Sequence, residues 1–333
     1  MNLQHRIDLL VKLGTYMLSE EASWQAAKLR AVQENSWFTP EFIDLSVRNI
    51  VQGFLQEPIL QNWAKKYNLP EEIETPKTVG IVMAGNIPLV GFHDFLSVFI
   101  SGHKMMIKPS SKDTALINQL IRQLTLWDSA ASTWIQVSDR LKNCHAYIAT
   151  GSNNSSRYFA YYFGKYPHII RRNRTSVAIL TGLETEQELR QLADDVYLYF
   201  GLGCRNVSKI YVPEQYDFVP LLEAFKKYSY LADHHKYKNN YDYNLAIHIL
   251  NNQFYMTNGS VILVENKSVF SPISQLHYEY YTDAAALQKE LQNNLDLQCV
   301  ISKNSIPFGQ AQCPAITDYA DGEDTLAFLQ KLK

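Results

Sequence analysis

Short apolar segments alternate with longer amphipathic ones along much of the chain. Apolar residues recur at helical spacing through residues 1–68, which predicts helices there. From Thr78 onward the pattern changes to short, β-branched runs separated by segments long enough for helices. Strands that alternate with helices of about 10 to 15 residues predict βαβ units. The fold class expected is therefore α/β, with mostly parallel sheets.

The pattern also predicts the individual elements. In the first half, strands are expected at 78–84, 104–109, 145–152, 168–170 and 176–182, with helices at 88–101, 114–127 and 155–165, the second capped by Asp113. In the second half, strands are expected at 207–213, 260–265, 274–281 and 297–302, with helices at 185–200, over much of 217–257, at 284–294 and at 323–333. The helix over 185–200 is expected to end at Gly201 in the left-handed conformation.

Three polar turns coincide with predicted strand ends. They are Gly85-Asn86, Lys108-Pro109-Ser110 and Thr150-Gly151-Ser152. Open parallel sheets bind their ligands at the carboxyl ends of the strands. The turns are therefore the first indication of a binding site.

The composition is that of a globular protein. Of the 333 residues, 46% are apolar and 19% are charged, unlike a disordered chain. At about 150 residues per domain, this length suggests two domains. The formal net charge of −2 gives no general attraction to nucleic acid or to an anionic membrane. No run of about 18 apolar residues occurs, so no transmembrane segment is expected.

The N-terminus and the cysteines bear on location. The opening MNLQHRIDLLVKLG predicts an amphipathic helix rather than a signal peptide. Cys144, Cys204, Cys299 and Cys313 lie far apart and form neither a CxxC pair nor a dense disulfide framework. A reducing, cytoplasmic setting is expected.

Cys204 is the thiol with the most suggestive surroundings. It lies in a glycine-containing loop after a predicted helix and beside Arg205. A neighbouring cation lowers a thiol pKa and favours the nucleophilic thiolate. The alternative is an inert buried cysteine, which is the more common fate of a single free cysteine. For the other three cysteines this inert interpretation is preferred.

The strand-end residues have two interpretations each. The Asn86 amide can donate to a developing oxyanion, or it can simply form the turn and cap a helix. Lys108 can hold a ribose hydroxyl or a phosphate, or it can be an exposed lysine at a sheet edge. Gly151-Ser152 opens a helix whose N-terminus can bind phosphate, or Ser152 is an ordinary cap.

Several familiar motifs are absent. The chain has no GxGxxG fingerprint, no P-loop and no HExxH. His234 and His235 are adjacent, so on a helix they would not share a face. No second group of ligands has zinc-like spacing, and no metal site is expected.

The order of the weak motifs is more informative than any one of them. The chain carries, in sequence, AGNIP at 84–88, IKPS at 107–110, ATGS at 149–152, RRNRTS at 171–176, GLGC at 201–204, VFSPI at 269–273 and PFGQ at 307–310. This order resembles that of the aldehyde dehydrogenase superfamily over residues 78–312. Within it, the chain is most similar to the acyl-CoA reductases related to the fatty-acid reductase of bacterial luminescence.

The resemblance implies roles for the catalytic and cofactor residues. Cys204 would be the nucleophile, and Asn86 would form the oxyanion hole with the backbone N–H of Cys204. Lys108, in the motif that ends with Ser110, would hold the adenosine ribose of a nicotinamide cofactor. Gly151 and Ser152 would hold its pyrophosphate, and Phe270 would lie near the nicotinamide ribose.

Two departures from the superfamily pattern bear on the reaction. The glutamate that activates water in oxidising members falls at about Arg171 here, and a second family glutamate, which holds the nicotinamide ribose, is replaced by about Ser268. Without a general base, hydrolysis of an acyl-enzyme is slow. Ser111 and Lys112 stand where NAD-preferring members often have an acid, so NADPH is expected over NADH, which stays possible.

The expected activity is reduction of an acyl-CoA thioester to a fatty aldehyde with NAD(P)H, through an acyl-cysteine. An acyl phosphate or acyl-carrier donor stays open, as does a member that binds a nucleotide or acyl group without turnover. The cofactor-binding domain would comprise 1–181, completed by 306–333, and the catalytic domain 182–305. The resemblance also makes a homo-oligomer possible. No nucleic-acid partner is expected.

Overall fold

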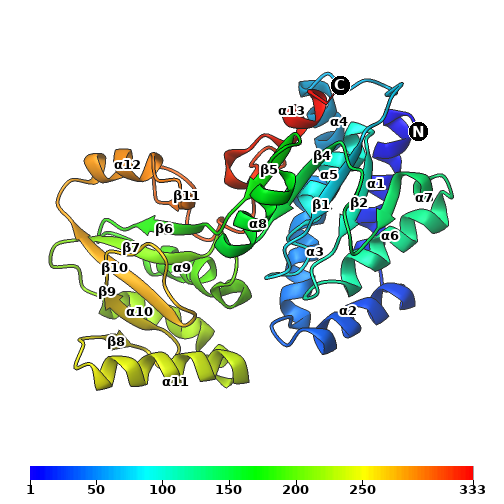
Figure 1. Cartoon of the computed structure of the whole chain (residues 1–333). Helices are drawn as coiled ribbons and strands as arrows, with labels where there is room; N and C mark the ends of the chain where they lie inside the picture. The colour runs from blue at the N-terminus through cyan, green and yellow to red at the C-terminus, as the bar shows by residue number, and fades with distance from the viewer. Residues whose placement is uncertain (333) are drawn as a thin grey trace. The chain divides into compact units, whose positions relative to one another are not determined.

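The chain forms two compact units in the computed structural model, which describes residues 1–332. Unit 1 comprises residues 1–173 and 314–332, and unit 2 comprises residues 174–313. Each unit is built around its own sheet, and both are drawn in Figure 1. The α/β fold with mostly parallel strands is confirmed. No helix within residues 1–332 is both long and apolar enough to cross a lipid bilayer.

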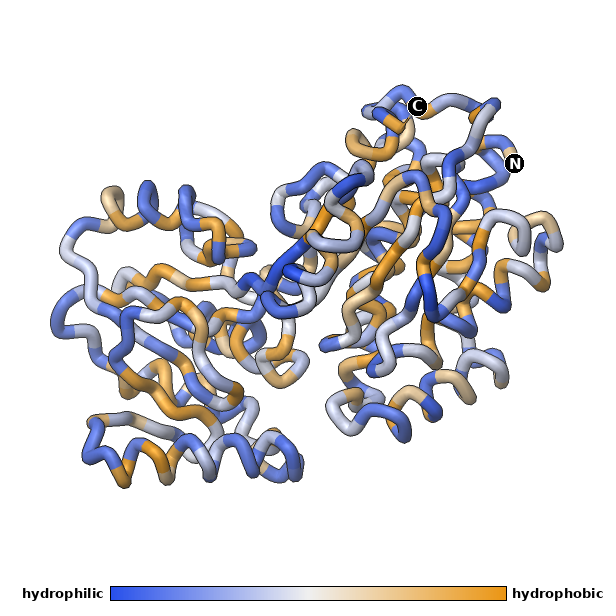
Figure 2. The backbone as a smooth tube through the Cα atoms, in the orientation of Figure 1, coloured by the Kyte–Doolittle hydropathy of each residue, from blue (hydrophilic) through white to orange (hydrophobic). Residues whose placement is uncertain are grey.

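The sheet of unit 1 is entirely parallel. Its spatial order is β3-β2-β1-β4-β5. The strands are β1 (Thr78–Val82), β2 (Lys104–Lys108), β3 (Ile135–Val137), β4 (Ala146–Thr150) and β5 (His168–Arg171). The central strand β1 is apolar on both faces, so helices must cover both sides of the sheet. Figure 2 shows hydrophobic residues along the central strands.

The helices of unit 1 supply that cover. The helical character predicted for residues 1–68 is confirmed in α1 (Leu3–Met17), α2 (Ala22–Glu34), α3 (Pro40–Phe54) and α4 (Glu57–Lys66). The remaining helices are α5 (Phe92–Ser101), α6 (Ala115–Trp127), α7 (Ala131–Trp134), α8 (Asn153–Phe163) and α13 (Thr325–Gln330). Helices α1, α3, α4, α5 and α6 share one hydrophobic core with the strands.

Residues 314–332 return to complete unit 1 after the chain has passed through unit 2. The indole of Trp63 donates to the hydroxyl of Tyr319 at 3.0 Å. The buried ring of His103 contacts the carbonyl oxygen of Leu329 at 3.1 Å. Apolar residues of α13 belong to the same core as α1 and α5. The first 173 residues therefore bury part of their surface only against this returning segment.

A buried ion pair lies inside unit 1. Arg171, at the end of β5, donates to both carboxylate oxygens of Asp94 at 2.8 and 2.6 Å. Its second terminal nitrogen donates to Thr325 Oγ1 at 2.8 Å. The side chains of Arg171 and Asp94 are only 3% and 9% exposed. The pair therefore joins β5, α5 and the returning helix α13.

The sheet of unit 2 has the order β11-β6-β7-β10-β9-β8, and every pair is parallel except β8 with β9. Its strands are β6 (Thr175–Ile179), β7 (Val207–Pro213), β8 (Met256–Thr257), β9 (Ile262–Glu265), β10 (Gln275–Tyr281) and β11 (Leu297–Ile301). Its helices are α9 (Glu186–Tyr197), η1 (Leu198–Gly201), α10 (Val219–Phe225), η2 (Lys226–Asp233), α11 (His235–Leu250) and α12 (Ala284–Gln292).

Three predictions need correction. The strand expected at 176–182 falls in the predicted cofactor domain of 1–181, but the strand observed there, β6, pairs with β7 and β11 in unit 2. An apolar strand pattern does not identify the neighbouring strands. The helix expected from residue 88 begins at Phe92, because Leu89 has a left-handed φ of +55°. Asp113 does not cap α6, because its carboxylate binds elsewhere.

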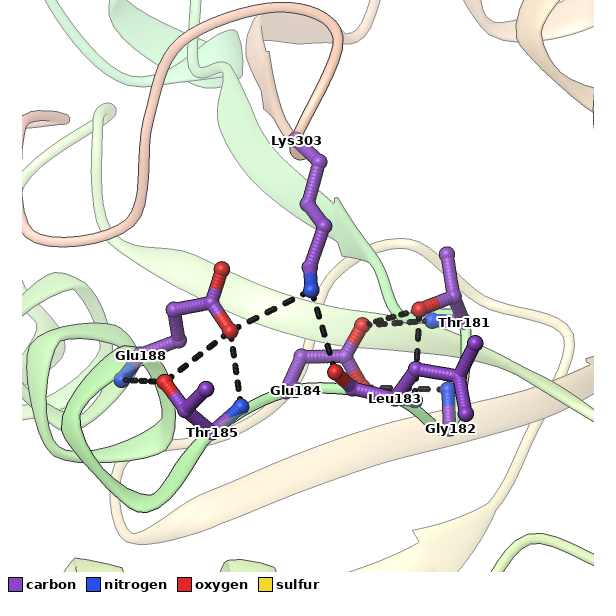
Figure 3. A network of polar contacts seen from close by, with 7 residues as sticks. All are labelled: Thr181, Gly182, Leu183, Glu184, Thr185, Glu188 and Lys303. Carbon is purple, nitrogen blue, oxygen red and sulfur yellow. Dashed lines mark hydrogen bonds and ion pairs between the residues drawn. The ribbon is translucent and has the colours of Figure 1, made fainter.

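The turn after β6 is fixed by a polar network (Figure 3). Glu184 accepts hydrogen bonds from the backbone of Thr181 and Gly182. Thr185 and Glu188 then form a capping box that begins α9. Lys303 donates to the carbonyl of Leu183 at 3.1 Å and pairs with Glu188 at 3.2 Å. The network therefore fixes the start of α9, which is the helix that precedes Cys204.

Removing one partner of the buried ion pair should be far more destabilising than breaking an exposed pair. Asp94→Ala leaves the Arg171 charge buried and uncompensated, so we expect a loss of about 3–5 kcal/mol in the free energy of unfolding. Glu186→Ala breaks an exposed pair with Arg190 and should cost less than about 1 kcal/mol. Urea unfolding of the full chain measures the loss of free energy of unfolding in each variant. Equal losses would contradict the larger contribution expected for the buried pair.

Candidate active site

The polar turns after β1 and β2 touch at the carboxyl edge of the sheet in unit 1. Val82 lies opposite Lys108 in the parallel register, so both strands end side by side. A Cβ placed on Gly85 would lie 2.6 Å from the Cβ and the hydroxyl of Ser110. Only glycine permits that approach. The structure therefore brings the AGNIP and IKPS motifs together, with Asn86 next to the contact.

The buried side chain of Asp113 fixes the backbone at this edge of the sheet. Its carboxylate accepts a hydrogen bond of 2.6 Å from the backbone N–H of Leu89. The side chain is buried, and its other oxygen, Oδ1, has no hydrogen-bond partner within residues 1–332. Burial raises the pKa of Asp113 to about 7, against the smaller opposing effect of the bond from Leu89. Asp113 thus fixes the left-handed turn between Asn86 and α5.

The residues around Ser110 present cations to solvent. Lys108, Ser111 and Lys112 are exposed. The backbone there is held locally, because Lys112 N–H donates to Ser110 Oγ at 3.2 Å and Asn35 Nδ2 donates to the Lys112 carbonyl at 3.1 Å. The edge therefore combines a fixed backbone with two lysine side chains that an anionic ligand can reach.

The third turn follows β4, the strand on the other side of β1. Ser152 caps α8, since its hydroxyl accepts from the backbone N–H of Ser155 at 3.3 Å. Gly151 is also tightly approached, and a Cβ there would lie 2.9 Å from the Phe159 ring. Ser152 is therefore a helix cap, and it is exposed at the same carboxyl edge of the sheet.

Arg171 is the residue that the resemblance aligns with the water-activating glutamate, and its contacts show whether it could act as a base. Its guanidinium is taken by Asp94 and Thr325 inside unit 1. The backbone carbonyl of Arg171 accepts from Gly151 N–H. A buried guanidinium engaged in this way is not a general base.

In unit 2, a strained segment precedes the half-buried Cys204. Tyr199, Phe200 and Gly201 all have left-handed φ values, of 55°, 58° and 73°. The left-handed conformation of Gly201 confirms the prediction, but the two aromatic residues before it were not expected to share it. Each such non-glycine residue costs about 1–2 kcal/mol. Both aromatic side chains are buried, so packing holds the strain.

Asn206 fastens the cysteine loop. Its Oδ1 accepts from Gly203 N–H at 2.8 Å. Its Nδ2 donates to the carbonyls of Asp195 at 3.0 Å and Leu198 at 2.8 Å. Because Asn206 is buried, these bonds connect the end of α9 to the loop without exposure to water. The position of Cys204 relative to α9 therefore depends on one amide side chain.

Asp195 fastens the PFGQ segment to the same helix. Its carboxylate accepts from Gly309 N–H at 2.7 Å and from Ala311 N–H at 3.0 Å. Arg205, next to Cys204, donates to the Ala311 carbonyl at 3.3 Å. Burial raises the pKa of Asp195 to about 7, although both backbone bonds oppose that rise. The cysteine loop and the PFGQ segment are thus joined within unit 2.

Residues 266–270, here called the crossing loop, lead from β9 toward β10 and carry Phe270. Three successive carbonyls of the loop meet three side chains of β7 and β10. Lys209 Nζ donates to Lys267 O at 2.8 Å, His277 Nδ1 contacts Ser268 O at 2.9 Å, and Ser208 Oγ donates to Val269 O at 2.5 Å. Burial lowers the pKa of His277, which favours the neutral ring.

Lys209 is the most deeply buried member of this set. Its side chain has 0% exposure and forms an ion pair with Glu279. Ser268 is the residue that the resemblance aligns with the second family glutamate, and its hydroxyl bonds to the backbone of Phe270.

The crossing loop and the cysteine loop share anchors at the start of β6 and β7. Thr175 Oγ1 lies 2.5 Å from Ser208 Oγ, and Ser176 Oγ donates to Cys204 O at 3.0 Å. The structure therefore ties the segments of Cys204 and Phe270 to the same strand ends of unit 2.

Several of these residues were not found from the sequence. Asn206, Asp195 and Lys209 act through contacts with residues distant in the chain, so no local pattern reveals them. His234 and His235 are not two neighbouring residues within one helix, because His234 is the N-cap of α11 and its side chain caps the helix. Within residues 1–332, no group of three or more His, Cys, Asp or Glu side chains could hold a metal ion.

The buried carboxyl of Asp113 predicts a pH dependence of stability. Its folded pKa of about 7 exceeds the ordinary value of 3.8. Between pH 8 and pH 6 the folded state therefore takes up a proton that the unfolded state does not. Stability should rise by about 1.4 kcal/mol from this group as the pH falls over that interval.

Asp113→Asn should gain about 1.4 kcal/mol less than the wild type over this interval, because its amide does not titrate, while Asp195 contributes equally in both proteins. Urea unfolding of the full chain at pH 8 and at pH 6 measures the gain. The exposed Asp217→Asn serves as the control and should keep it. The same gain in wild type and Asp113→Asn would contradict the assignment.

Comparisons with known proteins agree with this geometry. The sequence profile of the family described as acyl-CoA reductase (LuxC) matches residues 12–223. No curated protein matches the chain by sequence. Among solved structures, aldehyde dehydrogenase 21 of Physcomitrella patens, in complex with succinate, is similar with a TM-score of 0.72 and 13% identity, covering 100% of this chain and 85% of that one.

Two further structures have the same fold. A mutant of the indole-3-acetaldehyde dehydrogenase AldA of P. syringae, in complex with NAD+ and IAA, has a TM-score of 0.67 and 13% identity, covering 91% of this chain and 72% of that one. A Mycobacterium tuberculosis aldehyde dehydrogenase complexed with NAD+ has a TM-score of 0.66 and 12% identity, covering 91% and 73%. The family profile spans well over half of the sequence, and the chain belongs to the acyl-CoA reductase (LuxC) family, with the fold of aldehyde dehydrogenases.

Proposed function

We propose that the protein reduces an acyl-CoA thioester to a fatty aldehyde with NADPH, through an acyl group on Cys204. Unit 1 would bind the cofactor, and unit 2 would carry the nucleophile. The observation that supports reduction over oxidation is the state of Arg171. Because its guanidinium is buried against Asp94 and Thr325, that position offers no base for hydrolysing an acyl-enzyme.

The nucleophile follows from the cysteine loop. The thiolate of Cys204 attacks the carbonyl carbon of the thioester, and the bond from that carbon to the CoA sulfur breaks as CoA thiolate leaves. Arg205 is the next residue in the sequence, and its positive charge would assist a thiolate nucleophile. The Asn86 amide and the backbone N–H of Cys204 would donate to the oxyanion. After reduction of the acyl carbon, the carbon–sulfur bond to Cys204 breaks, releasing aldehyde and restoring the thiolate.

The residues at the carboxyl edge of unit 1 fit a nicotinamide dinucleotide. When bound, the nicotinamide supplies the hydride that reduces the acyl carbon. The close contact of Gly85 with Ser110 brings the two turns together at this edge, and Lys108 is exposed beside them. Ser152 at the start of α8 would face the pyrophosphate. The crossing loop would orient Phe270 toward the nicotinamide ribose.

The choice of NADPH rests on Ser111 and Lys112. Neither residue repels a 2′-phosphate, and both are exposed at the edge that would hold the adenosine ribose. A carboxylate at this place would instead accept from a free 2′-hydroxyl. The lysine gives the site a cation suited to the additional phosphate.

A cytoplasmic location suits this chemistry. No disulfide joins any of the four cysteines within residues 1–332. A nucleophilic thiol of this kind needs surroundings that keep it reduced.

Replacing the nucleophile should abolish turnover. Cys204→Ala should lower the rate of acyl-CoA-dependent NADPH oxidation by about 10³-fold or more, because no other group forms the acyl-enzyme. Cys144→Ala is the matched control, since that thiol is buried in unit 1. The loss of absorbance at the nicotinamide band reports both rates. Normal kinetics in Cys204→Ala would overturn the assignment of the nucleophile. Activity of the wild type only with an acyl phosphate or acyl-carrier substrate would show that acyl-CoA is not the acyl donor.

The cofactor preference should reverse with charge. The wild type should have a higher kcat/KM with NADPH than with NADH. Lys112→Glu should lower kcat/KM for NADPH by about tenfold, which corresponds to one charge-assisted contact of about 1.4 kcal/mol, and should leave the value for NADH largely unchanged. Lys289→Glu, an exposed lysine in unit 2, is the control for net charge. A clear NADH preference of the wild type would refute the proposal.

A further inference from the structure

We propose that Ser46 and Asp113 are positioning residues that aim the amide of Asn86, an inference that rests on the proposed role of Asn86 as an oxyanion donor. Asn86 lies in the turn that runs from β1 to α5. Ser46 belongs to α3, and Asp113 lies directly before the N-cap of α6. Neither side chain is assigned a contact with substrate or cofactor, so both would act through the turn.

Both side chains bind one peptide group of that turn. Ser46 Oγ donates to the Pro88 carbonyl at 2.7 Å, and the Asp113 carboxylate accepts from the Leu89 N–H at 2.6 Å. The carbonyl of Pro88 and the N–H of Leu89 belong to the same trans peptide, so they point in opposite directions. Ser46 and Asp113 therefore hold this peptide from its two sides. Each is only 6% exposed, which strengthens the bonds by excluding water.

The conformation of Leu89 shows why the peptide needs two partners. Leu89 has a left-handed φ of +55°, which a bulky residue rarely adopts. Its side chain is buried in the core of unit 1. A rotation of the peptide before Leu89 would change this φ and redirect the chain toward Asn86. Such conformations persist only where the surroundings over-determine them, and they are concentrated at functional sites.

The backbone is also fixed on the other side of Asn86. The Met83 N–H donates to the Lys108 carbonyl at 3.0 Å. A Cβ placed on Gly85 would lie 3.2 Å from the Cβ of Asp113, so Asp113 packs against the residue before Asn86 as well. Anchors therefore stand on both sides of Asn86 in the chain. This precision matters because a displacement of about 1 Å can cost about 10²-fold in rate.

A different role for Asp113 would be support of the cofactor edge alone, since it follows Ser111 and Lys112 in the chain. Ser46 separates the two roles. Its hydroxyl binds the Pro88 carbonyl and comes from α3, a helix of the N-terminal segment. The turn, rather than the lysine edge, is therefore the element that the two side chains share. The kinetic signature expected is a loss of kcat, not of cofactor binding.

Steady-state kinetics of the full chain test the inference. Ser46→Ala and Asp113→Ala should each lower kcat for acyl-CoA-dependent NADPH oxidation by about tenfold or more, with both KM values unchanged within about threefold. Asp113→Asn keeps an oxygen that accepts from Leu89 and should recover most of the lost kcat. The control is Ser97→Ala, which removes a buried hydroxyl bonded to the His93 carbonyl within α5 and should keep kcat within about twofold. A normal kcat in Ser46→Ala and Asp113→Ala, an equal loss in the control, or a raised KM for NADPH with normal kcat overturns the inference.

A double-mutant cycle shows whether the two residues act through Asn86. Asn86→Ala should lower kcat by about 10²-fold or more. In that background, Ser46→Ala and Asp113→Ala should change kcat by less than about twofold, because the amide that they position is absent. The same losses in both backgrounds overturn the inference and leave the role of Asn86 intact. An unchanged kcat in Asn86→Ala instead refutes the oxyanion donor of the proposed function, and the inference with it. If Asp113→Ala does not fold, Ser46→Ala decides by the same criteria.

Discussion

Parallel strand pairing is the constraint on which both units depend. A parallel strand can follow another only through a crossover, so the chain must leave each strand at the same edge of the sheet. In unit 1 this collects the turns after β1, β2 and β4 at one edge. The tight contact of Gly85 with Ser110 is a direct result of that geometry. The candidate cofactor residues of unit 1 lie at one edge because its sheet is parallel, although they are separated by many residues in sequence.

The order of elements and the polar turns were accessible from the sequence because both depend on local chemistry. The helices before residue 68, the strands from Thr78 and the left-handed Gly201 follow from periodicity and from glycine's freedom. The partners of β6 were not accessible, since an apolar strand can join either sheet. Asp113, Asp195 and Asn206 were likewise missed as anchors. Each binds the backbone of a segment whose approach is decided only by the finished fold.

Buried polar groups perform the same task in both units. Asp113 holds the turn that carries Asn86, Asn206 holds the loop of Cys204, and Lys209 holds the loop of Phe270. In each case the side chain binds backbone atoms of a neighbouring residue in the loop or turn. The arrangement allows reactive loops to lack regular secondary structure and still keep a defined shape.

The division of unit 1 into two sequence segments bears on how the protein is made. Unit 2, residues 174–313, is contiguous, and all of its residues are synthesised before the returning segment. Unit 1 has by then been synthesised as far as Asn173, but Trp63, His103 and Arg171 still lack Tyr319, Leu329 and Thr325. Domains generally form in order of synthesis. Here the later unit has all of its residues before the earlier one, whose core stays incomplete until residues 314–332 have been added.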